Sequence, residues 1–419
     1  MKLEVFDQER LDGKHGKAMQ FAMETIVTAA RIDRAESLID ISFAHIDACF
    51  YNGRAHLDFV LYMLEHGATL AVPSWTNNGL VSLNDLKVRD PMASREMNEA
   101  KQLMEAYVRL GCRPVWTCAP YQLPNRPALG DQIVGSESNA VSFYNSVIGA
   151  RTNKYGDYLD VCAAITGRVP YSKLHITRNR AAEIIIDVSE FSSSILENDL
   201  FYHLLGHITG LKNEGKVPAI VGLPNCCDED NLKAVSAAGS SSGSTPLFHA
   251  VGLTPEAETL DHALQGNSNV KTIKISVADL QKARQELGSS TIEGLKGIAL
   301  GTPHFSLTEF ERLVELLGDR QIDPALIFYL TTSRHVYGLA QEQGWTEILQ
   351  ASGVKIITDT CTYFSPAIKG LEGLIMTNSA KWAYYAPGML PVSALIGSLE
   401  ECVESAVSGR VQLDSSLMI

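Results

Sequence analysis

The sequence has no apolar run that approaches the length of a membrane span, and its first residues lack the apolar stretch of a secretory signal. These residues, MKLEVFDQERLDGKHGK, are charged throughout. We therefore expect a cytoplasmic protein with no membrane association. Basic residues are not in excess either, because 35 Lys and Arg face 48 Asp and Glu, a formal net charge of −13. Nucleic-acid phosphates require a basic surface, so this balance argues against a nucleic-acid partner.

The cysteines lack the spacing of a zinc finger or of a CxxC redox motif. Eight of them are scattered along 419 residues, which in a chain of this size is not a disulfide framework. Most are expected to be buried, inert thiols, and one or two are candidates for metal ligands. The sequence also lacks a tandem repeat and a helix-opening GxxxxGK[ST] phosphate loop.

What is present is an alternation of apolar strand-like segments and amphipathic helical segments, which predicts an α/β architecture with parallel sheets. The composition, 45% hydrophobic, supplies enough core for several domains or one large α/β body. Helices are expected at 57–67, 95–111 and 306–318, the last opening with a Ser306–Glu309 capping box. The expected strands are 38–45, 68–75, 113–120, 218–224, 297–304, 325–333 and 354–361.

The segment VSAAGSSSGSTPLF, residues 235–248, is rich in serine and glycine. Its composition favours a flexible loop. The alternative is a turn whose backbone amides face an anion.

A helix is also expected over SESNAVSFYNSVIGART, residues 136–152, and it carries an unusual stripe. Steps of four, three, four and three residues place five small polar residues or glycines on one helix face. A solvated helix face usually consists of Glu, Lys and Arg. We therefore expect this face to line a concave polar pocket. The stripe consists of Ser138, Ser142, Asn145, Gly149 and Thr152.

Several expected strands end in chemically active side chains, as in GTPHFS, TTSRH, DTCT and TCAPY. Ligands bind at the carboxyl ends of parallel strands, so at least two of these endings are expected to share one site. Cys118 and Cys361 each follow a strand; singly each is more often a packed thiol, but together they suit iron. His45 and His304 also lie at strand ends, where the backbone usually satisfies a histidine.

Lys381 directly follows an apolar run and a Thr-Asn-Ser group. A surface lysine is the ordinary interpretation. The aromatic residues Trp382, Tyr384 and Tyr385 beside it favour a buried or ligand-facing position, where a lysine would neutralise a substrate carboxylate.

With these segments in view, the sequence resembles aconitase X, the divergent branch of the aconitase superfamily. The similar stretches span nearly the whole chain in order. They are PSWTNNG (73–79), TCAPYQLPNRPALGDQIVGSESNAVSFYNSVIGARTN (117–153), AAITGRVP (163–170), SSGSTPLFHAVGLTPEA (241–257), LGTPHFSLTEF (300–310), TTSR (331–334), DTC (359–361) and TNSAKWAYYAPG (377–388).

The resemblance implies an aconitase-like core of several parallel-sheet α/β subdomains around a central cleft, covering 1–419 with boundaries near 190 and 290. Members are iron–sulfur dehydratases, with activity known on cis-3-hydroxy-L-proline and on mevalonate 5-phosphate. The resemblance further implies that Cys118 and Cys361 ligate the cluster, with 2Fe-2S, 3Fe-4S and 4Fe-4S forms all left open. It also implies that the polar stripe faces substrate.

The sequence departs from the family pattern in two ways. Many members carry cysteine in GCPH, whereas this chain has Thr302, so a third ligand is undecided, with Cys226 or Cys227 as candidates. No Gly-rich β-domain follows residue 400, so the swivelling domain that closes over aconitase sites is expected to be absent from this chain. A small swivel-domain subunit is the expected partner.

The reaction expected from this resemblance is loss of water from a small hydroxy acid, after proton removal beside its carboxylate. We favour cis-3-hydroxy-L-proline, because Thr302 suggests an altered cluster and no cluster of basic residues suits a phosphate. The alternatives are a mevalonate 5-phosphate dehydratase large subunit, a non-catalytic iron–sulfur or regulatory protein, and a metal-free α/β enzyme with structural cysteines. The catalytic candidates are His45, Glu137 and Lys381. The substrate-binding candidates are Asn77, Ser136, Ser138, Asn145, Arg151 and Thr152.

Overall fold

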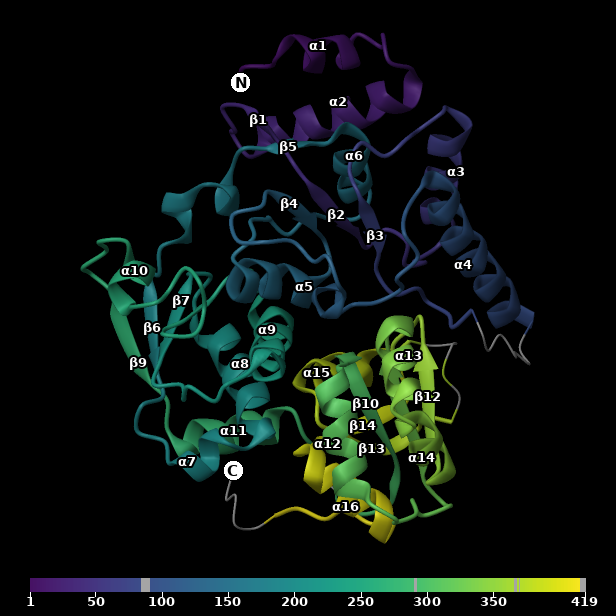
Figure 1. Ribbon diagram of the computed structural model, residues 1–419, viewed down its shortest axis with the longest axis vertical. Coiled ribbons are helices and arrows are strands. Elements are labelled where there is room, and N and C mark those ends of the chain that lie inside the picture. The colour runs from purple at the N-terminus through teal and green to yellow at the C-terminus, as the bar shows by residue number, and fades with distance from the viewer. Residues whose placement is uncertain (84–90, 290–291, 365–367, 369, 415–419) are drawn as a thin grey trace.

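The computed structural model describes residues 1–419 except 84–90, 290–291, 365–367, 369 and 415–419. Its described strands form three separate parallel sheets and one antiparallel pair. Each parallel sheet belongs to one α/β unit, and Figure 1 shows the three units arranged around α5, α9 and α15. No helix in the described part of the chain is both long and apolar enough to cross a bilayer.

The first unit contains the sheet β3-β2-β4 and the antiparallel pair β1-β5. Its strands are β1 (Leu38–Asp40), β2 (Phe43–Ile46), β3 (Ser74–Thr76), β4 (Ile133–Gly135) and β5 (Arg168–Pro170). Its helices are α1 (Val5–Leu11), α2 (Lys17–Ile32), α3 (Arg54–Glu65), α4 (Pro91–Leu110), α5 (Ser138–Phe143), the π-helix η2 (Tyr144–Ile148) and α6 (Leu159–Thr166), with 3₁₀ turns η1 (Pro120–Gln122), η3 (Lys173–His175) and η4 (Thr177–Arg180).

The second unit is built on the parallel sheet β8-β7-β6-β9. Its strands are β6 (Ile184–Asp187), β7 (Pro218–Val221), β8 (His249–Ala250) and β9 (Lys271–Lys274). Its helices are α7 (Ser193–Leu196), α8 (Asp199–Lys212), α9 (Glu229–Gly243), α10 (Leu260–Leu264) and α11 (Val277–Glu286).

The third unit has the sheet β12-β11-β10-β13-β14, all of it parallel. Its strands are β10 (Leu295–Phe305), β11 (Ile327–Thr332), β12 (Val354–Thr358), β13 (Gly373–Thr377) and β14 (Val392–Ile396). Its helices are α12 (Leu307–Leu317), α13 (Arg334–Glu342), α14 (Trp345–Ala351), α15 (Ala380–Met389) and α16 (Leu399–Ser408).

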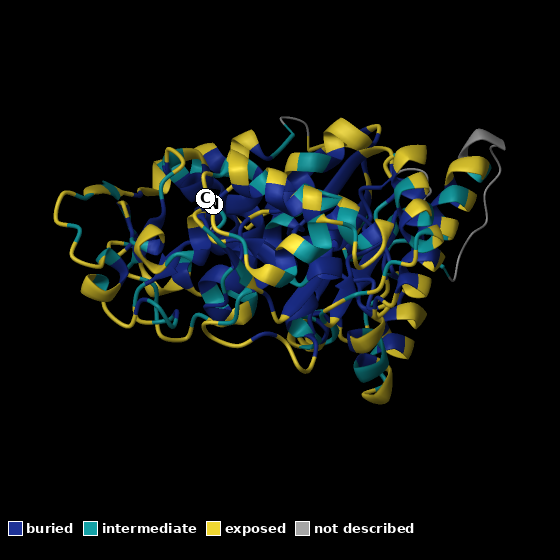
Figure 2. Cartoon of the chain, turned by 90° about the horizontal axis from the view of Figure 1, so that it is seen from above, coloured by how far each residue is buried: buried dark blue, intermediate teal, exposed yellow. Residues whose placement is uncertain are grey.

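The fold class expected from the alternating pattern is confirmed, and α12 illustrates why. The capping box of Ser306 and Glu309 is present at its N-terminus. Phe310, Leu313 and Leu317 then recur at helical spacing and are fully buried against the apolar side of the sheet. Figure 2 shows the consequence for the whole chain, with buried residues in the interior and exposed ones on the outer helices.

The expected strand at 113–120 is wrong. This segment forms one isolated bridge, between Arg113 and Trp75, before it enters η1. Pro114 has no backbone N–H to donate to a ladder, and Trp116 has a positive φ of 44° that breaks the extended conformation. The segment is therefore a buried, irregular connection that carries Cys118 toward the third unit.

The serine- and glycine-rich segment is not a flexible loop, because residues 235–243 belong to α9. The helix packs directly on α8, and glycines on both helices permit the close approach. A Cβ at Gly206 would lie 2.7 Å from the Val235 carbonyl oxygen, and one at Gly243 would enter the Gly210 carbonyl. Small residues here are a packing requirement between two helices that are distant in sequence.

We predict that Gly243→Ala lowers the free energy of unfolding by about 1–3 kcal/mol, because the methyl group overpacks the α8–α9 crossing. Urea unfolding of the purified chain measures the change. Gly338→Ala in α13 is the matched control, since no atom lies within 4 Å of its Cβ position. The control is expected to be neutral or slightly stabilising. Equal stability of the two variants would contradict the packing argument.

Candidate active site

Two cysteines separated by 243 positions meet where the first and third units face each other. The Sγ atoms of Cys118 and Cys361 lie 3.9 Å apart, and both residues are buried. His304 joins them, so that one ligand atom from each of the three lies within 4.8 Å of the others. The expectation that these two sulfurs converge within roughly 10 Å is confirmed.

A break in β10 brings His304 to the cysteines. The register of β10 against β11 shifts between Leu300 and Phe305, and Gly301 has a φ of 88° with no space for a Cβ beside Thr331. The His304 backbone N–H then donates to Cys118 Sγ at 3.4 Å. Its ring nitrogens lie 3.0 Å from Thr117 Oγ1 and 3.0 Å from the Thr360 carbonyl oxygen.

The two thiols differ in acidity. Burial raises the pKa of Cys118, but hydrogen bonding from Cys361 together with the charges of His304 and Lys381 lowers this pKa to about 6. The same contact, together with burial, raises the pKa of Cys361 well above its usual range. Cys118 is therefore the thiolate of the pair near neutral pH, and a thiolate is the form that binds a metal.

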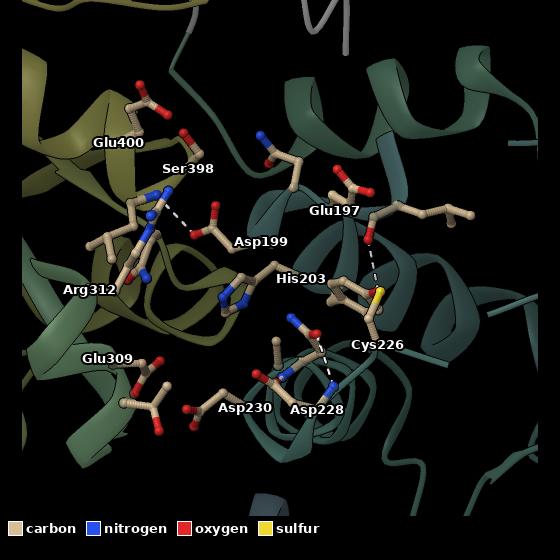
Figure 3. Close-up of a pocket in the computed structure, with 18 of the residues that line it drawn as sticks. Glu197, Asp199, His203, Cys226, Asp228, Asp230, Glu309, Arg312, Ser398 and Glu400 are labelled. Atoms are coloured by element: carbon tan, nitrogen blue, oxygen red, sulfur yellow. Dashed lines mark hydrogen bonds between the residues drawn. The ribbon is translucent and has the colours of Figure 1, made fainter. Parts of the chain in front are cut away.

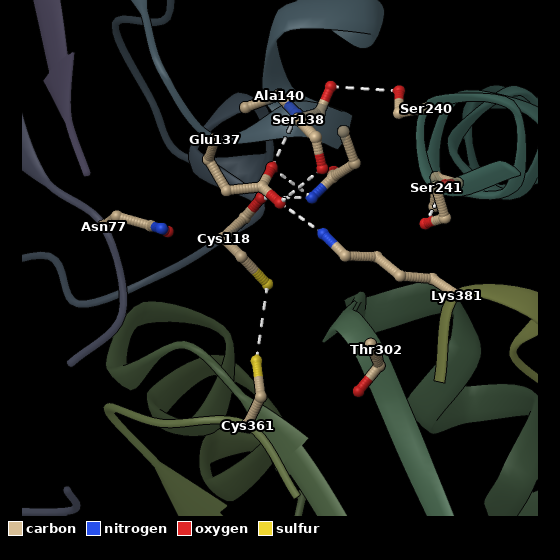
Figure 4. Close-up of polar contacts among 12 residues, drawn as sticks. Asn77, Cys118, Glu137, Ser138, Ala140, Ser240, Ser241, Thr302, Cys361 and Lys381 are labelled. Atoms are coloured by element: carbon tan, nitrogen blue, oxygen red, sulfur yellow. Dashed lines mark hydrogen bonds and ion pairs between the residues drawn. The ribbon is translucent and has the colours of Figure 1, made fainter. Parts of the chain in front are cut away.

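A buried ion pair lies beside the sulfurs, between Glu137 and Lys381 (Figure 4). Glu137 is the N-cap of α5, where its carboxylate accepts from the Ala140 N–H at 2.8 Å and from the Asn139 amide. Burial favours the neutral forms of both groups, but their mutual attraction prevails, lowering the pKa of Glu137 and raising that of Lys381. Both side chains are therefore charged.

Lys381 is 3% exposed and comes from the first turn of α15. Ser379 fixes this turn: its hydroxyl donates to the Thr302 carbonyl and accepts from the Trp382 N–H at 3.1 Å. The expectation that Lys381 is buried rather than on the surface is confirmed. Ser240 and Ser241 of α9 lie near it in Figure 4, and the sequence did not identify them because their segment resembled a loop.

Four buried polar atoms close to this group have no hydrogen-bond partner in the described structure: His45 Nδ1, Asn77 Oδ1, Ser136 Oγ and Thr302 Oγ1. Three of these residues lie at or just beyond the carboxyl ends of β2, β3 and β4. Buried polar groups are almost always hydrogen-bonded, so such a concentration indicates a ligand position. His45 is neutral, because burial lowers its pKa to about 4, and its Nε2 lies 3.0 Å from the Thr117 carbonyl oxygen.

The polar stripe over 136–152 does not form one face. The helix changes from α to π at Tyr144 and stops at Ile148, so the spacing of a regular helix no longer applies to its second half. Ser138 stays beside Glu137 and donates to it at 3.4 Å. Asn145 instead points into the joint with the second unit.

Both the nitrogen and the oxygen of the Asn145 side-chain amide hydrogen bond to other protein groups. Its Nδ2 donates to the carbonyls of Thr152 and Pro246, each at 2.9 Å, and its Oδ1 accepts from Arg180 at 2.9 Å. Arg180 is fully buried and also pairs with Glu256. The expected substrate-binding role of Asn145 is therefore corrected to a structural one.

Arg151 and Thr152 lie at the same contact between the first and second units. Arg151 donates to Thr177 Oγ1 at 2.7 Å and lies 3.7 Å from Glu256, while Thr152 donates to the Asn153 carbonyl at 2.7 Å. The terminal nitrogens of Arg151 and the hydroxyl of Thr152 thus contact protein groups, while Arg151 Nε has no partner in the described structure; substrate contact by these two residues stays a prediction.

Cys226 and Cys227 do not supply the third ligand in this arrangement. They lie before α9, exposed and half-buried respectively, and the group formed by Cys118, His304 and Cys361 does not include them. Cys226 lines a separate cavity of about 410 Å³ between the second and third units (Figure 3). His304, which the sequence places at a strand end in GTPH, lies beside the two cysteines instead.

Three family models match the chain in order: Aconitase X first domain over 1–178, second domain over 182–285 and third domain over 295–408. The chain is 41% identical to a cis-3-hydroxy-L-proline dehydratase of Pseudomonas aeruginosa, covering 98% of this chain and 70% of that protein. A protein of the same name from Hypocrea jecorina is 39% identical, with 96% and 68% covered.

Two archaeal proteins are also similar along nearly their whole length. A phosphomevalonate dehydratase large subunit of Methanothermobacter thermautotrophicus is 34% identical, with 94% of this chain and 96% of that protein covered. The crystal structure of Thermococcus kodakaraensis aconitase X in its holo-form superposes with a TM-score of 0.85 at 32% identity, covering 97% of this chain and all of that one.

We predict that Asn145→Ala lowers the free energy of unfolding by about 2 to 3 kcal/mol, because it leaves a buried Arg180 donor without its acceptor. Denaturant unfolding measures this loss. Asn179→Ala is the control, since its single hydrogen bond, to the Lys173 carbonyl, is at the surface. A stable Asn145→Ala protein that no longer binds substrate would restore the original interpretation.

Proposed function

The chain belongs to the aconitase X family, and we propose that it is a hydro-lyase that removes water from cis-3-hydroxy-L-proline. The two relatives that carry this activity in their names are 41% and 39% identical to it, whereas the similar phosphomevalonate dehydratase large subunits are 28% to 35% identical. The observation that carries the proposal is the buried Glu137–Lys381 pair beside Cys118 and Cys361.

The charge around the cysteines supports an amino acid over a phosphate ester. Lys381 lies beside the cysteines and is already neutralised by Glu137, and Arg334 near Cys361 is paired with Asp359. A phosphate monoester carries nearly two negative charges at neutral pH and is usually held by several Arg or Lys side chains. A single carboxylate needs one lysine. Mevalonate 5-phosphate remains the second candidate, because the chain aligns with nearly the full length of those large subunits.

The donor set supports an iron–sulfur cluster held by Cys118, Cys361 and His304. A tetrahedral metal with metal–sulfur bonds of about 2.3 Å holds two thiolates about 3.8 Å apart, and here the sulfurs are 3.9 Å apart. His304 Nε2–H donates to the Thr360 carbonyl, an arrangement common among histidine ligands, and Nδ1 would bind a metal in exchange for its present hydrogen bond with the Thr117 hydroxyl. When bound, iron supplies a Lewis acid for the leaving hydroxyl.

The protein groups then have separable roles. Lys381 binds the substrate carboxylate and stabilises negative charge as the proton beside that carboxylate is removed. Glu137 keeps Lys381 charged and holds it in place. The hydroxyls of Ser136 and Ser138 and the amide of Asn77 orient the substrate. Of these three residues Ser136 and Asn77 are buried, and their burial with Glu137 and Lys381 excludes water from the reacting atoms.

We also propose a second polypeptide as partner. Several similar proteins are named large subunits, and this chain aligns with 92% to 100% of their length. A small subunit that closes over the site would add the proton acceptor and exclude solvent.

The proposed ligands are tested by iron loading. Cys118→Ser, Cys361→Ser and His304→Ala are each expected to lose iron affinity by about 10- to 100-fold, because each removes one donor. Iron and acid-labile sulfide per chain, with visible absorption, are measured after anaerobic reconstitution. Cys226→Ser and Cys227→Ser are the controls and are expected to load fully. Loss of iron in either control, with full loading of His304→Ala, would reassign the third ligand.

The proposed reaction is tested by turnover of the reconstituted protein, with and without a co-expressed small subunit. We expect cis-3-hydroxy-L-proline to be dehydrated and mevalonate 5-phosphate not to be. Lys381→Met should lower kcat/KM about 100- to 1,000-fold, because it removes the charge that stabilises the developing anion. Arg151→Gln is the control and should retain activity, since Arg151 faces Glu256. Turnover of mevalonate 5-phosphate alone would overturn the proposal.

A further inference from the structure

Unsatisfied acceptor atoms gather where β2 and β3 end. His45 and Trp75 are register partners, and the chain continues from them to Asp47 and Asn77, whose side chains hydrogen bond to each other. Asn77 Oδ1 and His45 Nδ1 are buried and have no partner in the described structure. Nδ1 of His45 is an acceptor, because Nε2–H donates to the Thr117 carbonyl. The Asp47 side chain is half-buried, so Asn77 Oδ1 and His45 Nδ1 are the two buried acceptors here that lack a donor in the described structure, and the neighbouring Asn78 Nδ2 also lacks a partner.

The same place holds more negative charge than positive. Burial raises the pKa of Asp47 to about 8, and the carboxylates of Asp157, Glu137 and Asp160 contribute to the rise. The pKa of Asp160 is also raised, to about 7, by burial and by Asp157. Lys381 is paired with Glu137, and His56 lies 3.8 Å from Asp157. A cationic group with N–H donors would satisfy both the acceptors and the charge.

We propose that Asp47, Asn77 Oδ1 and His45 Nδ1 bind the positively charged ring nitrogen of a cyclic imino acid, opposite the lysine that binds its carboxylate. This inference rests on the proposed function and names the residue that selects an amine-bearing substrate. A secondary ammonium carries two N–H donors, one each for Asn77 Oδ1 and His45 Nδ1, and Asp47 supplies the opposite charge. In Figure 4, Asn77 points toward Cys118 and Glu137 from one side, and Lys381 reaches Glu137 from the other.

This arrangement discriminates by charge as well as by hydrogen bonding. An ammonium beside Asp47 restores a full carboxylate and is stabilised by it. A hydroxy acid without an amine leaves Asn77 Oδ1 and His45 Nδ1 unpaired, and leaving buried polar groups unpaired is how a site rejects such an analogue.

The test compares two ring acids that differ at one atom. L-Proline and cyclopentanecarboxylate are titrated calorimetrically into the cluster-loaded wild-type protein and into Asp47→Asn. Wild type is expected to bind L-proline at least about 10-fold more tightly than the carbocycle. Asp47→Asn should lose about 10- to 100-fold in affinity for L-proline and keep its affinity for the carbocycle. The substitution is isosteric and relieves repulsion among carboxylates, so folding is preserved.

Asp157→Asn is the matched control, because it removes a neighbouring charge without removing a contact to the ligand. It should change L-proline affinity less than about threefold, since a half-exposed charge is screened. Equal binding of both acids by wild type, no measurable binding of L-proline, or an unchanged preference in Asp47→Asn would each overturn the inference. Turnover of cis-3-hydroxy-L-proline by wild type is measured separately. Its absence, with the preference intact, would remove the proposed reaction and leave the amine site standing.

Discussion

The buried pair of Glu137 and Lys381 is the interaction on which the site depends, because it connects the first and third units at their shared interior. Each charged side chain is also held by its own helix. Glu137 caps the N-terminus of α5, and Lys381 lies in a helical turn fixed by Ser379. A buried ion pair is weak evidence for stability, since apolar residues of similar size often do as well. Its persistence beside two thiols therefore points to chemistry, and removing one partner would leave a charge that the interior cannot solvate.

Parallel sheets explain how such distant segments converge. The carboxyl ends of β2, β3 and β4 carry His45, Asn77 and Ser136, while β12 leads to Cys361 on the third unit. The carboxyl ends of the strands in the first and third units face the same interior. Residues that follow four different strands therefore become neighbours, although they are far apart in the sequence. The break at Gly301 adds His304 to this group, at the cost of a regular ladder between β10 and β11.

The sequence was sufficient for the fold class, because apolar strands and amphipathic helices alternate along the chain. Cys361 does follow a strand, but Cys118 lies on an irregular connection, so the pairing of the two cysteines rested on the family resemblance. The sequence was insufficient where the local structure depends on contacts with residues far away in the sequence. Residues 235–243 have the composition of a loop, yet they form a helix because Gly206 and Gly210 of α8 offer a surface that only small residues can approach. The prediction that the polar stripe shares one helix face was wrong for a related reason. The π-helix that begins at Tyr144 places Asn145 on a different face from Ser138, and the buried Arg180 donates a hydrogen bond to the Asn145 amide oxygen.

The distribution of charge decides between the two substrate classes more sharply than sequence identity does. The proposed site is dipolar, with one lysine at one end and several carboxylates at the other. Two like charges about 4 Å apart cost about 4 kcal/mol at an effective dielectric constant near 20, roughly a thousandfold in affinity. Any anion bound by Lys381 lies beside Glu137, so both substrate classes meet that repulsion at the lysine end. At the other end an imino acid presents an ammonium to Asp47, whereas a phosphate ester without an amine presents no cation. Burial and the neighbouring carboxylates raise the pKa of Asp47 to about 8 in the free protein, and the same carboxylates would favour an ammonium ligand.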